Sequence, residues 1–131
     1  MAFPISTLKA IREKLVIDGS IVIEVPSAND LLLNQLYTKS FMEFTLWSQH
    51  LILHTPDSLK RFLQMAGFRQ IMIRQVQRYG LSNHMTWLHK GMPGGHKHEL
   101  SCIESPELVA AYQASIAAIG ACDTLIATAK A

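Results

Sequence analysis

The fold is decided by the stretch Leu15-Val-Ile-Asp-Gly-Ser-Ile-Val-Ile-Glu-Val-Pro26, in which a turn leads into a short apolar run. The β-branched residues from Ser20 to Val25 favour a strand, which Pro26 closes. Asp18-Gly19 offers a residue that can adopt positive φ, so a helix over 5–16 ends before the strand. Because the strand is nearly all apolar, we expect it to be buried on both faces.

Three helix starts follow, each marked by a residue that can cap a helix. Ser27 caps a leucine-rich helix that has Asp30 near its positive end. Thr55 and Pro56 begin a helix over 56–66 that Gly67 terminates, and Ser105 and Pro106 begin another that Gly120 terminates.

Two more strands and two less regular stretches complete the order of elements. Residues 68–79 predict a strand with Ile71 and Ile73 on one side, and residues 123–130 predict the last strand. Residues 38–54 show no clean period, so we expect an irregular, partly buried connection there. A short helix over 82–90 and a flexible loop follow the second strand. The fold class is therefore α/β.

Composition excludes several classes of protein. The 131 residues are 49% hydrophobic and 17% charged, which is typical of one folded domain. The net charge is +2 and the basic residues are scattered, so we expect no nucleic-acid partner. No apolar run is long enough to span a membrane and no secretory signal is visible, which favours the cytoplasm. Cys102 and Cys122 are expected to be free thiols.

Two motifs resemble a known family, the class I S-adenosylmethionine-dependent methyltransferases. Leu15 to Pro26 is similar to the turn and fifth strand of that family, where a strand ends in Glu-Val-Pro. His50-Leu-Ile-Leu-His-Thr-Pro-Asp-Ser-Leu59, running on to Ala66-Gly-Phe68, is similar to the pattern of His, capped helix and Ala-Gly-Phe that follows this strand. The stretch from Gln77 to His96, with Asp123 to Ala127, resembles a bacterial subgroup associated with sugars and surface polysaccharides.

The resemblance implies a partial Rossmann-like fold over residues 1–131. Its three strands would be the family's fifth, sixth and seventh, forming a three-stranded mixed sheet in the order 5, 7, 6 with flanking helices. The last strand would lie antiparallel between the other two.

The resemblance also implies that one half of the family fold is missing. The family grips S-adenosylmethionine with a Gly-rich loop after its first strand and an acidic residue after its second, and this sequence shows neither pattern. Gly94-Gly95 has no strand before it, so it cannot replace that loop. We therefore expect a single domain, the carboxyl-terminal half of a methyltransferase, that does not bind the cofactor alone.

His50 is the candidate catalytic residue. It matches the family's motif histidine, which implies a role in removing a proton from the methyl acceptor. Gln49 stands where the family often has an acidic residue. The alternative is a histidine that anchors the segment through a hydrogen bond to the backbone.

A group of polar and aromatic side chains near the end of the second strand is predicted to bind substrate. Ligands collect at strand ends in open α/β sheets, and such side chains suit an acceptor with hydroxyl or phosphate groups. The alternative is that the aromatic residues only pack the core. The candidates are Trp47, Gln49, Arg78, Tyr79, Asn83, His84 and Trp87.

Metal binding is the weaker interpretation of the histidines. His50 and His54 have a spacing that occurs in zinc sites on helices, but no third ligand stands at a recognisable distance. His89, His96 and His98 could also bind a metal ion, although a solvated loop is the commoner explanation for such residues. We predict no metal site.

Two functions therefore follow from the sequence. The first is the acceptor-side portion of a methyltransferase acting on a small molecule or sugar derivative, inactive alone. The second is a non-catalytic interaction module. In either case the first strand would expose an apolar edge, which predicts a homo-oligomer.

Overall fold

The computed structural model describes residues 3–47, 50, 52–97 and 99–131. In these ranges helices and strands alternate along the chain. The elements are α1 (Pro4–Lys14), β1 (Ser20–Pro26), the π-helical turn η1 (Leu31–Gln35), α2 (Lys39–Thr45), α3 (Pro56–Met65), β2 (Arg69–Val76), α4 (Leu81–Lys90), the 3-10 turns η2 (Gly95–Lys97) and η3 (Glu99–Ile103), α5 (Pro106–Ala118) and β3 (Thr124–Lys130).

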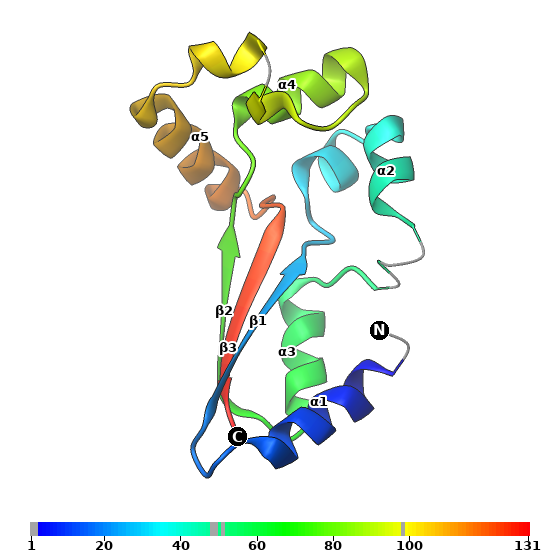
Figure 1. Cartoon of the computed structure of the whole chain (residues 1–131), viewed down its shortest axis with the longest axis vertical. Helices are drawn as coiled ribbons and strands as arrows, with labels where there is room; N and C mark the ends of the chain where they lie inside the picture. Colours follow the sequence, from blue (N-terminus) through cyan, green and yellow to red (C-terminus); the bar gives the residue numbers. More distant parts are fainter. Residues whose placement is uncertain (1–2, 48–49, 51, 98) are drawn as a thin grey trace.

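The three strands form one sheet in the order β1-β3-β2. Both hydrogen-bonded pairs are antiparallel, so β1 and β2 run in the same direction on either side of β3 (Figure 1). Pro26 and Val76 both pair with Thr124, which places the ends of β1 and β2 beside the start of β3. The predicted α/β class, strand order and flanking helices are confirmed. Within these strands the sheet is antiparallel rather than mixed.

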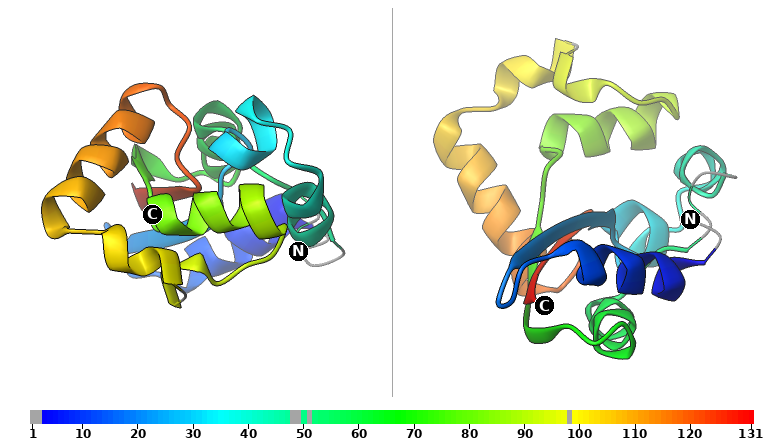
Figure 2. Two further views of the ribbon diagram at one scale, coloured as in Figure 1. Left: turned by 90° about the horizontal axis from the view of Figure 1, so that it is seen from above. Right: turned by 60° about the horizontal axis from the view of Figure 1, so that its bottom comes forward.

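The core lies between the sheet and the helix pair α1 and α3. These two helices lie on the same side of the sheet, and α2, α4 and α5 gather near the end where β3 begins (Figures 1 and 2). Leu59 and Leu63 of α3 pack on Leu125 and Ala127 of β3. All four side chains are almost fully buried, and each apolar side chain removed from water stabilises the fold by about 1.5–3 kcal/mol.

The prediction that β1 is buried on both faces is wrong. Its residues alternate between exposed and half-buried, and Val22 is 68% exposed. Met72 lies on the same open face of the sheet, because it and Val22 both pair with Thr128 of β3. The apolar run suggested two covered faces, but the helices that contact the strands cover the opposite face.

Helix α3 forms as the sequence predicts. The Thr55 hydroxyl accepts a hydrogen bond from the Ser58 backbone N–H at 3.1 Å, and the Ser58 hydroxyl accepts one from the Thr55 N–H at 2.9 Å. This reciprocal pair is a capping box, and Pro56 occupies the first turn. Gly67 adopts φ +90°, which allows the chain to turn away into β2.

Two local predictions before and after β1 need correction. The helix before it ends at Lys14 rather than near Val16, and Asp18 adopts the positive φ, +60°. Gly19 is needed because a Cβ there would meet the Val16 carbonyl oxygen at 2.8 Å. After the strand, Asp30 and not Ser27 caps the next helix, which is the short π-helical turn η1.

The stretches expected to be irregular contain short helices. Residues 38–54 include helix α2, in which Phe41 and Phe44 pack on Trp87. The period escaped detection because α2 has only seven residues. The loop after α4 contains η2 and η3, which pack against α4. In the part of the chain that the structure describes, no helix is long and apolar enough to cross a bilayer.

Candidate functional site

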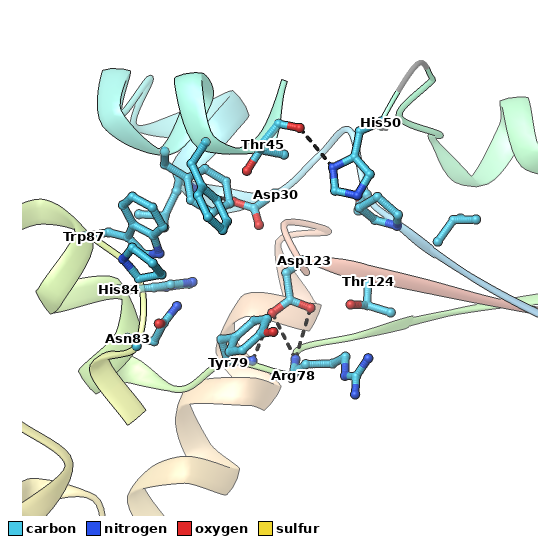
Figure 3. A pocket seen from close by; sticks show the side chains of 18 of the residues that line it. Asp30, Thr45, His50, Arg78, Tyr79, Asn83, His84, Trp87, Asp123 and Thr124 are labelled. Atoms are coloured by element: carbon cyan, nitrogen blue, oxygen red, sulfur yellow. Dashed lines mark hydrogen bonds between the residues drawn. The ribbon is translucent and has the colours of Figure 1, made fainter. Parts of the chain in front are cut away.

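A cavity of about 510 Å³ lies at the end of the sheet where β3 begins. Side chains from β1, η1, α2, α4 and the start of β3 surround it (Figure 3). A pocket of this size can hold a small organic molecule. Strand ends position the site, since β1 and β2 finish where β3 starts.

Most of the predicted site residues meet at this cavity. The lining includes His50, Arg78, Tyr79, Asn83, His84 and Trp87. Trp47 is not part of the lining; its half-exposed ring packs edge-on against the ring of His50, with centroids 6.3 Å apart. Gln49 lies outside the described residues. The structure therefore gathers residues that the sequence separates into two stretches.

His50 is held by the backbone and keeps one ring nitrogen free. Its Nδ1 lies 2.9 Å from the carbonyl oxygen of Thr45. Because a carbonyl oxygen only accepts hydrogen bonds, this contact places the proton on Nδ1 and leaves Nε2 as the acceptor nitrogen. Both interpretations of His50 thus find support in the same contact: the ring anchors the segment, and its second nitrogen can accept a proton.

Arg78 and Tyr79 lie at the exposed rim of the cavity. The Arg78 guanidinium forms an ion pair with Glu24 of β1, and both side chains are about half exposed. This pair links the ends of β1 and β2 across the start of β3. An anionic ligand would have to compete with Glu24 for Arg78.

His84 is a buried residue in the wall of the cavity, and both of its ring nitrogens contact other residues of the chain. Its Nδ1 lies 2.6 Å from the Tyr112 hydroxyl, and its Nε2 accepts from Gln77 Nε2 at 3.3 Å. Only 3% of the residue is exposed. Burial lowers the pKa of His84, opposed in part by Asp123, so the ring is neutral near pH 7.

Asp123 joins the end of β2 to the start of β3. Its carboxylate accepts hydrogen bonds from Gln77 Nε2 at 2.9 Å and from the backbone N–H groups of Arg78 and Tyr79 at 3.0 Å. All three of these bonds reach Oδ2, and the Arg78 N–H also lies 3.1 Å from Oδ1, which allows the residue to be 91% buried. Asp123 therefore fixes the backbone that carries Arg78 and Tyr79 into the site.

Asp30 is a second buried acid in the lining. Its Oδ1 accepts from the backbone N–H groups of Leu32 at 2.7 Å and Leu33 at 3.2 Å. Burial, with a smaller contribution from Asp123, raises the pKa of Asp30 to about 6, although the two N–H donors oppose this shift. Figure 3 shows the carboxyl groups of Asp30 and Asp123 amid the ring of labelled side chains.

The wall opposite the strands is aromatic. Trp87 of α4 is 3% exposed, and its ring contacts Phe41 at 5.1 Å and Phe44 at 5.2 Å between centroids. Both phenylalanines also line the cavity. The site therefore combines an apolar wall with a few polar groups, which is typical of small-molecule pockets.

The structure is similar to the crystal structure of a SAM-dependent methyltransferase from Archaeoglobus fulgidus, with a TM-score of 0.55 and 18% sequence identity. The fold is methyltransferase-like. The match covers 99% of this chain and 52% of the other, so this chain spans about half the length of that structure. No family model and no curated protein matches the sequence.

Two glycines in the segment after β2 are closely packed against other parts of the chain. A Cβ on Gly95 would collide with the backbone of Ser82, and one on Gly80 would collide with the Glu104 side chain. These glycines allow close packing inside the chain, whereas a cofactor loop uses its glycines to let the backbone approach a ligand.

The two histidines considered for metal binding each have one ring nitrogen within hydrogen-bond distance of another group of the chain. His54 is 8% exposed, its Nδ1 lies 3.2 Å from the Ser58 hydroxyl, and its ring packs edge-on against Phe62. Burial lowers the pKa of His54. Among the residues that the structure describes, no three acidic, histidine or cysteine side chains lie close enough to bind a metal ion. His98 and the His96 side chain are outside that set.

Sequence reasoning missed the two buried acids and the two phenylalanines of the aromatic wall as parts of the site, whereas Trp87 was predicted. Asp30 was recognised only as an acid near a helix start, and Asp123 only as the start of a strand. In the sequence, Asp30 directly precedes three leucines and Asp123 follows the turn at Gly120. Neither pattern indicates that the two carboxylates share a cavity.

Proposed function

We propose that the chain is the acceptor-side portion of an S-adenosylmethionine-dependent methyltransferase that acts on a small molecule or sugar derivative and is inactive alone. The observation that carries this proposal is the cavity at the strand ends of a methyltransferase-like fold, with the free Nε2 of His50 in its lining. The similarity of residues 77–96 to a bacterial sugar-associated subgroup supports the choice of acceptor.

In this proposal the residues of the chain orient the acceptor and remove its proton. The aromatic wall and the Arg78 rim hold the acceptor so that its nucleophilic atom is positioned for transfer. His50 Nε2 takes the proton of a hydroxyl or amino group, while the Nδ1–H remains bound to the Thr45 carbonyl. A neutral imidazole is suited to this step near pH 7.

Isothermal titration with S-adenosylmethionine tests the claim of inactivity alone. We expect no measurable heat of binding, because the sequence shows neither the Gly-rich loop after a strand nor the acidic residue with which the family holds the cofactor. Micromolar affinity, about −8 kcal/mol, would contradict the claim that the cofactor is held by a part of the enzyme that this chain does not contain.

A chimera tests the methyltransferase function itself. The uncovered half of the Archaeoglobus fulgidus protein would be joined before residue 1, and formation of S-adenosylhomocysteine would be measured with panels of alcohols, amines and sugars. We expect acceptor-dependent turnover that His50→Gln lowers by about 10²-fold or more. His89→Gln, on the exposed end of α4, is the matched control and should retain activity. A chimera that binds S-adenosylmethionine but methylates none of these compounds would count against the proposal.

A non-catalytic module that forms homo-oligomers is the second candidate function. Strand β1 is at the edge of the sheet and pairs with β3 on one side, and its Val22 side chain is 68% exposed. Edge strands with apolar faces favour pairing with another chain. This candidate requires no ligand in the cavity, so binding of a small molecule there favours the first.

A further inference from the structure

Asp30 is a buried acid without a positively charged partner among the described residues. It is 95% buried, and its Oδ1 accepts two backbone hydrogen bonds. Its Oδ2 forms no hydrogen bond to a described residue. The ion pairs in the described parts of the chain join other side chains. A buried carboxylate without a counter-charge is costly, so a cation supplied from outside the chain would be favoured beside it.

The groups that face Asp30 add negative charge or none. Asp123 is the charged neighbour that raises its pKa. Tyr112 on α5 and Cys122 before β3 have pKa values raised by burial and, to a smaller extent, by Asp30 itself, so both are neutral near pH 7. His84 on α4 has a pKa lowered by burial and is neutral as well.

The cationic side chains in the lining are occupied elsewhere or exposed. Arg78 forms its ion pair with Glu24 at the rim. Lys97 is an exposed residue of η2. The interior of the cavity is therefore acidic although the chain as a whole carries a charge of +2.

The aromatic wall adds a second feature that suits a cation. Phe41, Phe44 and Trp87 line the same cavity as Asp30. Aromatic faces attract organic ammonium groups and also bury the apolar body of such a molecule. A neutral hydroxyl ligand would gain from the wall but would leave the charge of Asp30 without a counter-ion.

We propose that the cavity binds a small molecule carrying a protonated amino group, and that this ammonium group forms an ion pair with Asp30. The inference rests on the proposed function in that we take this molecule to be the methyl acceptor. The backbone N–H groups of Leu32 and Leu33 hold Oδ1, and the ligand binds Oδ2.

Two probes of similar shape test this proposal on the whole chain. Benzylamine is a cation at pH 7.5, and benzyl alcohol is neutral. Each would be titrated into the ¹⁵N-labelled chain and followed by NMR at the Leu32 and Leu33 amides, which donate directly to Asp30. We expect benzylamine to bind at least about tenfold more tightly than benzyl alcohol.

The variant Asp30→Asn removes the charge and keeps an oxygen that can cap η1. In this variant we expect both probes to bind with equal affinity, whereas Asp57→Asn on the exposed first turn of α3 should keep the preference for benzylamine. If Asp30→Asn fails to fold, the same comparison at about pH 5 replaces it. Asp30 is then mostly protonated and benzylamine is still charged, so the preference should be lost.

Three results would overturn the proposal: equal binding of the two probes to the unmodified chain, a preference that persists in Asp30→Asn, or no amide shift at millimolar benzylamine. None of these measurements uses S-adenosylmethionine. A chimera that methylates only alcohols would therefore overturn the amine proposal and leave the methyltransferase function standing. Amine binding without methyl transfer would instead support the ammonium site and count against the methyltransferase function.

Discussion

At the scale of single residues, Asp30 combines a structural role with an electrostatic cost. Its Oδ1 caps η1 through the Leu32 and Leu33 N–H groups, which stabilises the turn. Burial, with a smaller contribution from Asp123, raises its pKa to about 6. An asparagine would satisfy the same backbone donors without the charge, so the cap alone does not require an acid at this position.

The stability of the chain should therefore depend on pH through Asp30. The folded state keeps this proton up to about pH 6, whereas an unfolded chain releases it near 3.8. Between these values the folded state binds more protons, so the free energy of unfolding falls as pH rises, by up to about 3 kcal/mol. We expect Asp30→Asn to be more stable than the unmodified chain at pH 7 and equal to it at pH 4, as measured by urea unfolding.

The comparison with the variant isolates Asp30 from the two buried histidines. Burial lowers the pKa values of His54 and His84, so both residues reduce stability as pH falls through the unfolded histidine pKa. Because both are present in each protein, their contribution cancels in the difference. Lower stability of Asp30→Asn at pH 7 would show that Asp30 has an unseen partner.

At the scale of elements, two helices are preceded by a threonine at the N-cap, but only one of these threonines caps its helix with a hydrogen bond. Thr55 accepts the Ser58 N–H at the start of α3. Thr38 precedes α2, but its hydroxyl is buried and makes no hydrogen bond to a described residue. In α3 the Ser58 hydroxyl also accepts a hydrogen bond from the Thr55 N–H, which completes the capping box.

Thr55→Ala should destabilise the chain by about 1 kcal/mol, because it leaves a backbone N–H of α3 without its acceptor. Thr38→Ala is the matched control and should leave the free energy of unfolding unchanged or raise it, since an unpaired buried hydroxyl is removed. Both would be measured by urea unfolding. Equal losses in the two variants would mean that the capping box contributes nothing specific.

At the scale of the whole molecule, the sheet has one covered and one open face. Helices α1 and α3 lie over the covered face (Figure 2), while Val22 and Met72 lie exposed on the other. The structure from Archaeoglobus fulgidus is about twice as long as this chain. An open apolar face beside an edge strand is a surface on which a second polypeptide can pack.

Self-association should follow from this surface. We expect the chain to elute above its monomer size in size-exclusion chromatography at high concentration, and Val22→Lys to shift it to the monomer because a charge then lies on the edge strand. Val16→Lys, at an exposed position in the turn before β1, should have no effect. A monomer at every concentration would exclude the interaction module and remove the support for a homo-oligomer.

The sequence predicted helices best where the residues that begin and end the helix are all close together in the sequence. Thr55, Pro56 and Gly67 mark both ends of α3, and Ser105 with Gly120 marks α5. It failed where a signal depended on neighbours from elsewhere in the chain. The apolar run of β1 gave no information on which face would be covered, and α2 was too short to show a period.

The candidate site, too, was predicted only in those residues whose local sequence carries a signal. His50, Arg78, Tyr79, Asn83, His84 and Trp87 carry recognisable chemistry and were named from the sequence, and the structure brings them to one cavity. The role of Asp30 could not be predicted, because its raised pKa comes from burial against segments far away in the chain.

The sequence by itself determined the order of the main helices and strands and both ends of α3, because caps, prolines, glycines and β-branched runs act within a few residues. Only the tertiary structure decided which face of the sheet is open, which histidine keeps a free nitrogen, and that Asp30 and Asp123 share a cavity with an aromatic wall. These features arise from desolvation and contact between distant segments, and short windows of sequence do not contain that information.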